Sequence, residues 1–379
     1  MQTRKTMMDV AAIMTSFARR TGLTDPSVVP RRYLWTDAHA VCTLLSLFRT
    51  TGDDRYRRLA LALIDQVHNV LGKHRADDPR EGWISGLEEE EGREHPTAGG
   101  LRIGKELRER RQSEPINERL EWERDGQYFH YLTKWMHALC RAAAITGESR
   151  YARWALELAR AAYAGFVVSD RGARRLRWKM SIDLSYPLVA SSGHHDPLDG
   201  YITCHEILHA GNDDLDKELA ELAGMIEGRQ WATNDALGIG GLLFDACRVV
   251  ELTAARQIDG VALAKTLLVA ALQSLEVFEA GSNLAHAAEY RLAFRELGLS
   301  IGLHAITMMA RVVDEAAGSF DPELVRVLAA LRRFSGTATS IEAFWLRADN
   351  QKTSSWLDHA DINAVTLATS LLPDEFLAV

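Results

Sequence analysis

The chain has 379 residues, with 52 acidic and 44 basic side chains and a net charge of −8 at neutral pH. This balance provides no electrostatic drive toward nucleic acid or an anionic membrane surface. A hydrophobic content of 47% excludes disorder as the main state. We see no uninterrupted apolar run of the roughly 20 residues that span a bilayer, and the first apolar run is too short for a signal peptide. Four cysteines without a CxxC pair exclude a disulfide scaffold. We therefore expect a cytoplasmic protein.

Apolar residues that recur every three to four positions predict an all-α chain. The expected helices are 5–20, 36–50, 55–71, 127–145, 149–165, 200–211, 215–227, 237–252, 260–278, 294–314, 322–334 and 359–372. Only 165–170 and 175–185 have the composition of strands, and they are short enough for a hairpin within a loop. Glycines near the start of 237–252 indicate that this helix lies very close to a neighbour.

An internal repeat supports pairing of these helices. Residues 51–68 and 146–163 are identical at eight of eighteen positions. In each copy a helix ends in Thr-Gly, and the glycine can adopt the left-handed conformation of a helix C-cap. An Asp or Ser then caps the next helix, and a Tyr one turn later packs back on the partner. The repeated unit is therefore a helical hairpin.

The connections between pairs are much longer than those within pairs. They cover 72–126, 166–199, 228–236, 279–293 and 335–358. Long loops on a helical scaffold are usually functional. If the helices that follow these loops run parallel, all their N-terminal ends gather on one face. The first helix would then pair with the last, closing a ring of six hairpins.

Six hairpins, this turn and the loop arrangement resemble the (α/α)6 six-hairpin glycosidase superfamily. The segment 124–128 before an inner helix resembles the start of that helix in unsaturated glucuronyl and rhamnogalacturonyl hydrolases, and 95–100 resembles N-acylglucosamine 2-epimerases. The resemblance implies a single (α/α)6 toroid over 1–379, with the N-terminal helix against the C-terminal inner helix. It also implies a carbohydrate-active enzyme.

Two carboxylates are the main catalytic candidates. Asp125 and Asp199 each come just before or at the start of an expected inner helix, and His195 lies in the same long loop as Asp199. Glycoside cleavage needs one carboxylic acid to protonate the leaving oxygen and a second group to activate water. For each aspartate alone, a helix cap explains the position equally well.

Aromatic and charged residues at the same end of the expected helices are candidates for substrate binding, because tryptophan in a loop often stacks on a sugar ring. A basic stretch over 92–111 suggests an anionic group on the substrate, although Glu88–Glu91 could balance it in a solvated loop. For any single residue, packing or capping is the simpler explanation. The substrate-binding candidates are Trp35, Asp37, Arg102, Lys105, Trp122, Gln127, Tyr128, His130, Arg291, Glu296, Trp345, Trp356 and His359.

The sequence His205–His209 matches HExxH, which on a helix can hold zinc. No convincing strand precedes it, and the possible third ligands Glu218, Glu221 and Glu227 are ordinary acids of a helix surface. We therefore expect a chance match, with no metal and no cofactor.

We expect a glycoside hydrolase that acts by carboxylate acid–base catalysis on a short oligosaccharide, which can be anionic. Its ligand would be a small carbohydrate, with neither nucleic acid nor membrane as a partner. The alternatives are a sugar epimerase or isomerase using histidines such as His195 and His359, a non-catalytic ligand-binding toroid, and a zinc hydrolase. The sequence does not decide whether the protein is a monomer or a homo-oligomer.

Overall fold

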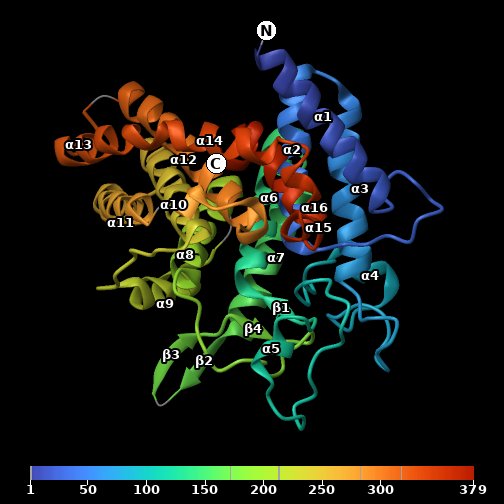
Figure 1. Cartoon of the computed structure of the whole chain (residues 1–379). Coiled ribbons are helices and arrows are strands. Elements are labelled where there is room, and N and C mark those ends of the chain that lie inside the picture. The colour runs from blue at the N-terminus through green and yellow to red at the C-terminus, as the bar shows by residue number, and fades with distance from the viewer. Residues whose placement is uncertain (1, 171, 212–213, 282, 317) are drawn as a thin grey trace. The chain divides into compact units, whose positions relative to one another are not determined.

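The computed structural model describes residues 2–170, 172–211, 214–281, 283–316 and 318–379, and most of its regular elements are helices (Figure 1). Its contacts divide the chain into two compact units. The N-terminal unit is Ala18–Glu227, and the C-terminal unit combines Met1–Phe17 with Gly228–Val379. The single domain over 1–379 stays a prediction.

The N-terminal unit consists of three helical pairs, α2 with α3, α6 with α7 and α8 with α9, and α6 also contacts α2 and α8. Its helices are α2 (Leu34–Thr51), α3 (Asp54–Leu71), α4 (Glu89–Glu94), α5 (Glu118–Glu121), α6 (Phe129–Thr146), α7 (Ser149–Phe166), α8 (Asp196–Ala210) and α9 (Asp216–Ile226). The central helices α2 and α6 are buried over most of their length, as expected for the inner members of hairpins.

The repeated turn has the predicted geometry. Gly52 and Gly147 end α2 and α6 with φ of 70° and 72°, in the left-handed region that favours glycine. The Asp53 carboxylate accepts a hydrogen bond from the Arg55 backbone N–H and so caps α3. In the second copy the expected Ser cap is wrong, because Glu148 is the N-cap and Ser149 lies inside α7.

Two short antiparallel pairs of strands lie in the loops between the helices. β2 (Val167–Asp170) pairs with β3 (Ala173–Leu176), which confirms the predicted hairpin (Figure 1). β1 (Gln127–Tyr128) pairs with β4 (Lys179–Met180). Because β1 uses the backbone of residues 127–128, α6 begins at Phe129 and not at 127 as predicted.

The C-terminal unit is organised around one long helix, α12, which contacts α10, α14 and α16. Its helices are α1 (Gln2–Arg20, of which residues up to Phe17 belong here), α10 (Ala236–Ala254), α11 (Val261–Ala280), α12 (Ala293–Glu315), α13 (Pro322–Leu331), α14 (Ser335–Trp345), α15 (Ser354–Leu357), α16 (Ala360–Leu371) and α17 (Asp374–Leu377). Short 3-10 turns are η1 (Asn283–Ala285), η2 (Ala288–Tyr290), η3 (Arg332–Phe334) and η4 (Asn350–Lys352).

Glycines allow α10 and α12 to touch through their backbones, as the glycine cluster predicted. A Cβ on Gly240 would lie 2.2 Å from the Gly298 carbonyl oxygen, and one on Gly302 would lie 2.5 Å from the Gly240 carbonyl oxygen. Each of the twelve predicted helices has a counterpart, but the expectation of a loop over 335–358 is wrong, because α14 occupies its first half.

Two helices of this unit, α11 and α12, have the length and composition of membrane-spanning segments, with mean hydropathies of 1.6 and 1.3. The expectation that no segment would qualify was therefore too strict. Core helices pass the same test, and 72% of the α12 window and 44% of the α11 window is buried within the protein.

Candidate functional site

The first turns of α2, α6 and α8 lie together in the N-terminal unit. The Lys134 ammonium of α6 donates to an Asp199 carboxylate oxygen of α8 at 2.8 Å, and the Thr133 hydroxyl donates to the same oxygen. On the other side of α6, the Tyr131 ring lies 5.3 Å from the Trp35 ring of α2. Within this unit, the predicted gathering of inner-helix N-termini is therefore confirmed.

Two aspartates occupy the first turn of α8. The helix begins at Asp196 with His195 as its N-cap, and Pro197 follows, a residue favoured in the first helical turn. The prediction that the helix begins at 200 with Asp199 as a cap is wrong. Residues three apart on a helix have Cβ atoms about 5–6 Å from each other, so Asp196 and Asp199 are neighbours on one face.

These two carboxyl groups have opposite environments. Asp199 is bonded to an ammonium and a hydroxyl, which favour its charged form. Asp196 is buried, and its Oδ2 atom has no hydrogen-bond partner among the described residues. Burial and the nearby Asp199 charge raise the pKa of Asp196 to about 7. A protonated acid beside a charged carboxylate is the arrangement that general acid–base chemistry uses.

Half-buried aromatic rings adjoin the carboxyl pair. The His130 Nδ1 atom lies 3.9 Å from an Asp196 oxygen, and burial with the nearby Lys134 charge lowers the pKa of His130 to about 4. His130 is therefore neutral near pH 7. Its ring stacks on Tyr128 at 5.5 Å, and Trp35 lies 6.0 Å away. These contacts bring together the predicted binding residues Trp35, Tyr128 and His130.

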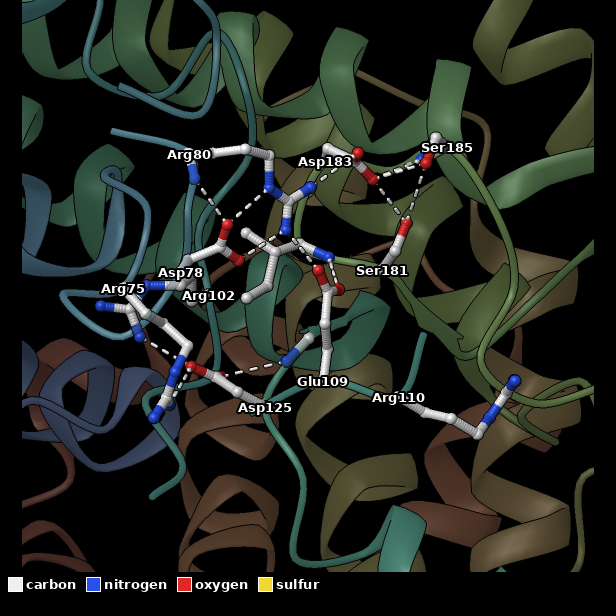
Figure 2. Close-up of polar contacts among 12 residues, drawn as sticks. Arg75, Asp78, Arg80, Arg102, Glu109, Arg110, Asp125, Ser181, Asp183 and Ser185 are labelled. Carbon is white, nitrogen blue, oxygen red and sulfur yellow. Dashed lines mark hydrogen bonds and ion pairs between the residues drawn. The ribbon is translucent and has the colours of Figure 1, made fainter. Parts of the chain in front are cut away.

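Asp125 lies in a different setting, shown in Figure 2. Its carboxylate is 0% exposed and accepts hydrogen bonds from the Arg102 guanidinium at 2.6 Å and the Arg75 guanidinium at 3.2 Å. The backbone N–H groups of Gly104, Lys105 and Gly126 donate to its other oxygen. The predicted cap is wrong, because the N-cap of α6 is Tyr128. A buried carboxylate with five donors fits an anchor of the 72–126 loop better than an acid that must meet substrate.

The same loop is fixed at a second point. The Arg80 guanidinium pairs with Asp78, Glu109 and Asp183 at 2.8, 2.5 and 2.8 Å (Figure 2). The Gln127 amide oxygen accepts from the Leu101 N–H at 2.9 Å, and its amide nitrogen donates to two backbone carbonyls. Gln127 is therefore engaged in holding the loop, which was not its predicted role.

Several basic side chains of this loop also have internal partners. Arg102 pairs with Asp125, Arg110 with Glu121, and both Arg108 and Arg124 with Glu114. The Lys105 ammonium donates to the Trp122 carbonyl oxygen. These pairs weaken the charge argument for Arg102, Arg108 and Arg110, whereas Lys105 has a carbonyl partner only, so an anionic group on the substrate stays a prediction.

Asp37 supports the start of α2, but the capping alternative is wrong, because the N-cap is Tyr33 and Asp37 lies inside the helix. Its carboxylate accepts from the Tyr33 N–H at 2.9 Å and pairs with the Arg32 guanidinium at 3.2 Å. The two groups of the pair are buried. Trp122 is exposed, and His195 is half-buried at the start of α8.

The remaining candidates lie in the C-terminal unit and form a packed cluster. The Arg291 guanidinium makes two bonds to Glu296, at 2.8 and 2.7 Å, and the Trp345 indole N–H donates to Glu296 at 2.8 Å. Trp356 stacks on Trp345 at 5.6 Å. All four side chains are buried, whereas His359 is exposed as the N-cap of α16. Their contacts fit a folding role.

A surface hollow of about 520 Å³ also lies in this unit, but at the C-terminal end of α12. It is lined by Thr307, Ala310, Arg311, Asp314, Glu315, Arg332 and Ser335. No aromatic ring lines it, and the Arg291–Glu296 pair lies at the other end of α12. We therefore assign it no part in the site.

The HExxH segment does not have the arrangement of a zinc site. Glu206 is buried, and its carboxyl group shares a hydrogen bond of 2.6 Å with the His137 Nδ1 atom of α6. Its side chain is therefore directed into the helical core. His209 is exposed at the end of α8. Among the residues the structure describes, no three His, Cys, Asp or Glu side chains are grouped as metal ligands.

Sequence reasoning missed Asp196, Tyr131, Lys134 and Trp178. Asp196 is preceded by two histidines and followed by a proline, and this first-turn proline was the available signal for the helix start. Lys134 gave a second signal, since a lysine among the apolar residues of an inner helix requires a buried carboxylate partner.

No protein-family model matches the chain, and no curated protein matches it by sequence. Among solved structures, the chain is similar to an inactive variant of the α-1,6-mannanase of Salegentibacter sp. HEL1_6 in complex with α-1,6-mannotetrose, with 12% identity, a TM-score of 0.57, and coverage of 98% of this chain and 99% of that chain. The structure of the α-1,6-mannanase itself aligns with 12% identity, a TM-score of 0.55, and coverage of 96% of this chain and 98% of that chain.

A cellobiose 2-epimerase from Spirochaeta thermophila DSM 6192 aligns with 10% identity, a TM-score of 0.49, and coverage of 96% of this chain and 98% of that chain. The likeness to the mannanase shows the fold. The chain has an all-α (α/α)6 fold, as the sequence predicted.

Proposed function

We propose that the protein is a carbohydrate-active enzyme, a glycoside hydrolase that cleaves a short oligosaccharide at the first turn of α8. The observation that carries the proposal is the Asp196–Asp199 pair, two adjacent carboxyl groups with opposite environments beside half-buried rings. The shared fold with a mannanase that was solved with mannotetrose adds support from architecture, although fold alone does not define a reaction.

In this proposal Asp196 is the general acid. Its carboxyl group is protonated up to about pH 7 and would donate its proton to the leaving glycosidic oxygen. Asp199, held by Lys134 and Thr133, would keep its charge and stabilise the positive charge that develops on the sugar, or activate the attacking water. Asp125 would act indirectly, by fixing the 72–126 loop.

The half-buried rings of Trp35, His130 and Tyr131 would receive the apolar face of the sugar next to the carboxyl pair. His195, as the N-cap of α8, is proposed to contact the substrate from the other end of the same turn. We favour an uncharged sugar, because three arginines of the basic loop, Arg102, Arg108 and Arg110, already have carboxylate partners.

The test is a count of reducing ends released from a panel of oligosaccharides that includes α-1,6-mannotriose. Hydrolysis raises the number of reducing ends, whereas epimerisation changes the sugar composition at a constant number. We expect release with the parent protein and none above background with Asp199→Asn. Equal release by both proteins would exclude the α8 site, and a changed composition without new ends would favour the epimerase.

The dependence of activity on pH follows from the Asp196 environment. Since the acid must carry its proton and its pKa is about 7, kcat/KM is expected to fall about tenfold per pH unit above that value. A profile measured from about pH 5 to about pH 9 checks this. An activity that stays constant up to the alkaline end would contradict Asp196 as the acid.

A further inference from the structure

Trp122 is an exposed tryptophan on a well-fixed turn. Its side chain is 56% exposed, and its ring lies 4.9 Å from Trp178 at an interplanar angle of 34°. The Trp178 indole N–H donates to the Ser191 hydroxyl at 2.6 Å, which fixes the orientation of the inner ring. The two indoles therefore form a tilted pair with an open outer face.

Two lysine side chains donate hydrogen bonds to the backbone carbonyl groups of the turn that contains Trp122. The Lys179 ammonium, which is completely buried, donates to the Arg124 carbonyl oxygen at 2.9 Å and also to the Glu121 carbonyl oxygen. The Lys105 ammonium donates to the carbonyl oxygen of Trp122 itself. Because this turn is already ordered, a ligand that stacks on Trp122 would lose little affinity to ordering of the loop.

A continuous series of ring contacts connects this pair to the proposed catalytic carboxyl groups. Trp178 lies 5.1 Å from Tyr128, and Tyr128 stacks on His130 at 5.5 Å. His130 in turn lies 3.9 Å from Asp196. Trp122 is therefore linked to the reaction site by ring contacts that pass through the buried Tyr128, and it is the most exposed ring of this series.

We infer that Trp122 and Trp178 form an outer subsite, which stacks on a hexopyranose ring of the oligosaccharide remote from the bond that is cleaved. The inference rests on the proposed function, since it requires the α8 site to be where cleavage occurs. A flat indole face with polar groups around it suits the apolar face of a pyranose, whose hydroxyls point outward. The subsite makes the enzyme prefer longer oligosaccharides over disaccharides.

The experiment measures binding to the Asp199→Asn protein, which does not turn over its ligand, with α-1,6-mannobiose and α-1,6-mannotetrose as probes. Replacement of Trp122 by alanine is expected to raise the Kd for mannotetrose about threefold to tenfold, the usual size of one aromatic contact. The Kd for mannobiose should stay the same. Trp122→Phe should restore most of the affinity for mannotetrose, because phenylalanine keeps a stacking face.

The matched control is Ile116→Ala, because Ile116 lies on the same loop and is 59% exposed but has no ring. It should leave both Kd values unchanged. A loss of affinity with Ile116→Ala as large as with Trp122→Ala would mean that the loop is a general apolar docking surface, and would overturn the inference.

Equal effects of Trp122→Ala on both sugars, or none on either, would also overturn it. The proposed function is tested by a separate measurement, the number of reducing ends that the parent protein releases. If no sugar is cleaved or bound, both proposals fall. If sugars are cleaved without dependence on Trp122, only the outer subsite falls.

Discussion

Replacement of Asp196 by asparagine is expected to lower kcat by about a hundredfold or more, the usual contribution of a general acid. The stability of the variant relative to the parent should rise between about pH 4 and about pH 7 and stay higher above that range. Asparagine has nearly the same shape but no proton to donate. It removes the ionisable group but keeps a polar amide at the same buried position. The measurements are kcat on the substrate that the parent cleaves and the Tm of both proteins.

The direction of the stability change follows from proton linkage. The pKa of Asp196 is raised from 3.8 to about 7 on folding, so between these values the folded state binds more protons than the unfolded state. The contribution of Asp196 to stability therefore falls as the pH rises through this window and stays low above it. The Tm of Asp196→Asn minus that of the parent should accordingly increase from about pH 4 to about pH 7.

Asp199→Asn is the control for this pair. It should also inactivate the protein, but it should lower the Tm, because the buried Lys134 ammonium loses its carboxylate partner. Full turnover by Asp196→Asn, or a Tm difference that decreases with pH, would contradict the assignment of Asp196.

Asp125→Asn is expected to destabilise the N-terminal unit by about 3–5 kcal/mol, the typical result of removing one partner from a buried ion pair. Asparagine leaves the guanidinium of Arg102 and that of Arg75 without a counter-charge at this position. It also replaces one acceptor oxygen by an NH2 group that faces donors. The free energy of unfolding, measured in urea, checks the magnitude.

Asp77→Asn provides a matched control, since Asp77 pairs with the same Arg75 but its side chain is 57% exposed. We expect it to cost less than about 1 kcal/mol, as exposed ion pairs usually do. If Asp125→Asn kept full stability and lost activity, Asp125 would return as a direct catalytic group.

Local signals were sufficient to predict the helical hairpins. The Thr-Gly ends of α2 and α6, the Asp53 cap and the apolar periodicity all act within a few residues of each other. The glycines of α10 also predicted a close helix contact, because a residue without a side chain lets a neighbouring backbone approach at its own position. Errors occurred where a partner from a distant segment decided the outcome, as for residues 127–128, which pair with β4.

The proposed pair of carboxyl groups was identified only in part from the sequence, which indicated Asp199 but not Asp196, for the same reason. Asp125 and Asp196 both precede an inner helix and look alike in one dimension. Their difference is in their partners: Asp125 meets guanidinium groups 23 and 50 residues away, and Asp196 meets a neutral histidine and a second aspartate. Only the folded chain tells whether an acid is neutralised by cations or left to hold its proton.

The attachment of several segments to Asp125 has a consequence for how the protein moves. Three amide hydrogens and two arginine side chains of the 72–126 region depend on one carboxylate. These five hydrogen bonds all end on the same carboxylate. They cannot break one after another from one end of the segment, as the bonds of a fraying helix do. The region should therefore open as one cooperative unit, with its amides exchanging with solvent together and rarely, so that the loop beside the site spends nearly all its time in a single shape.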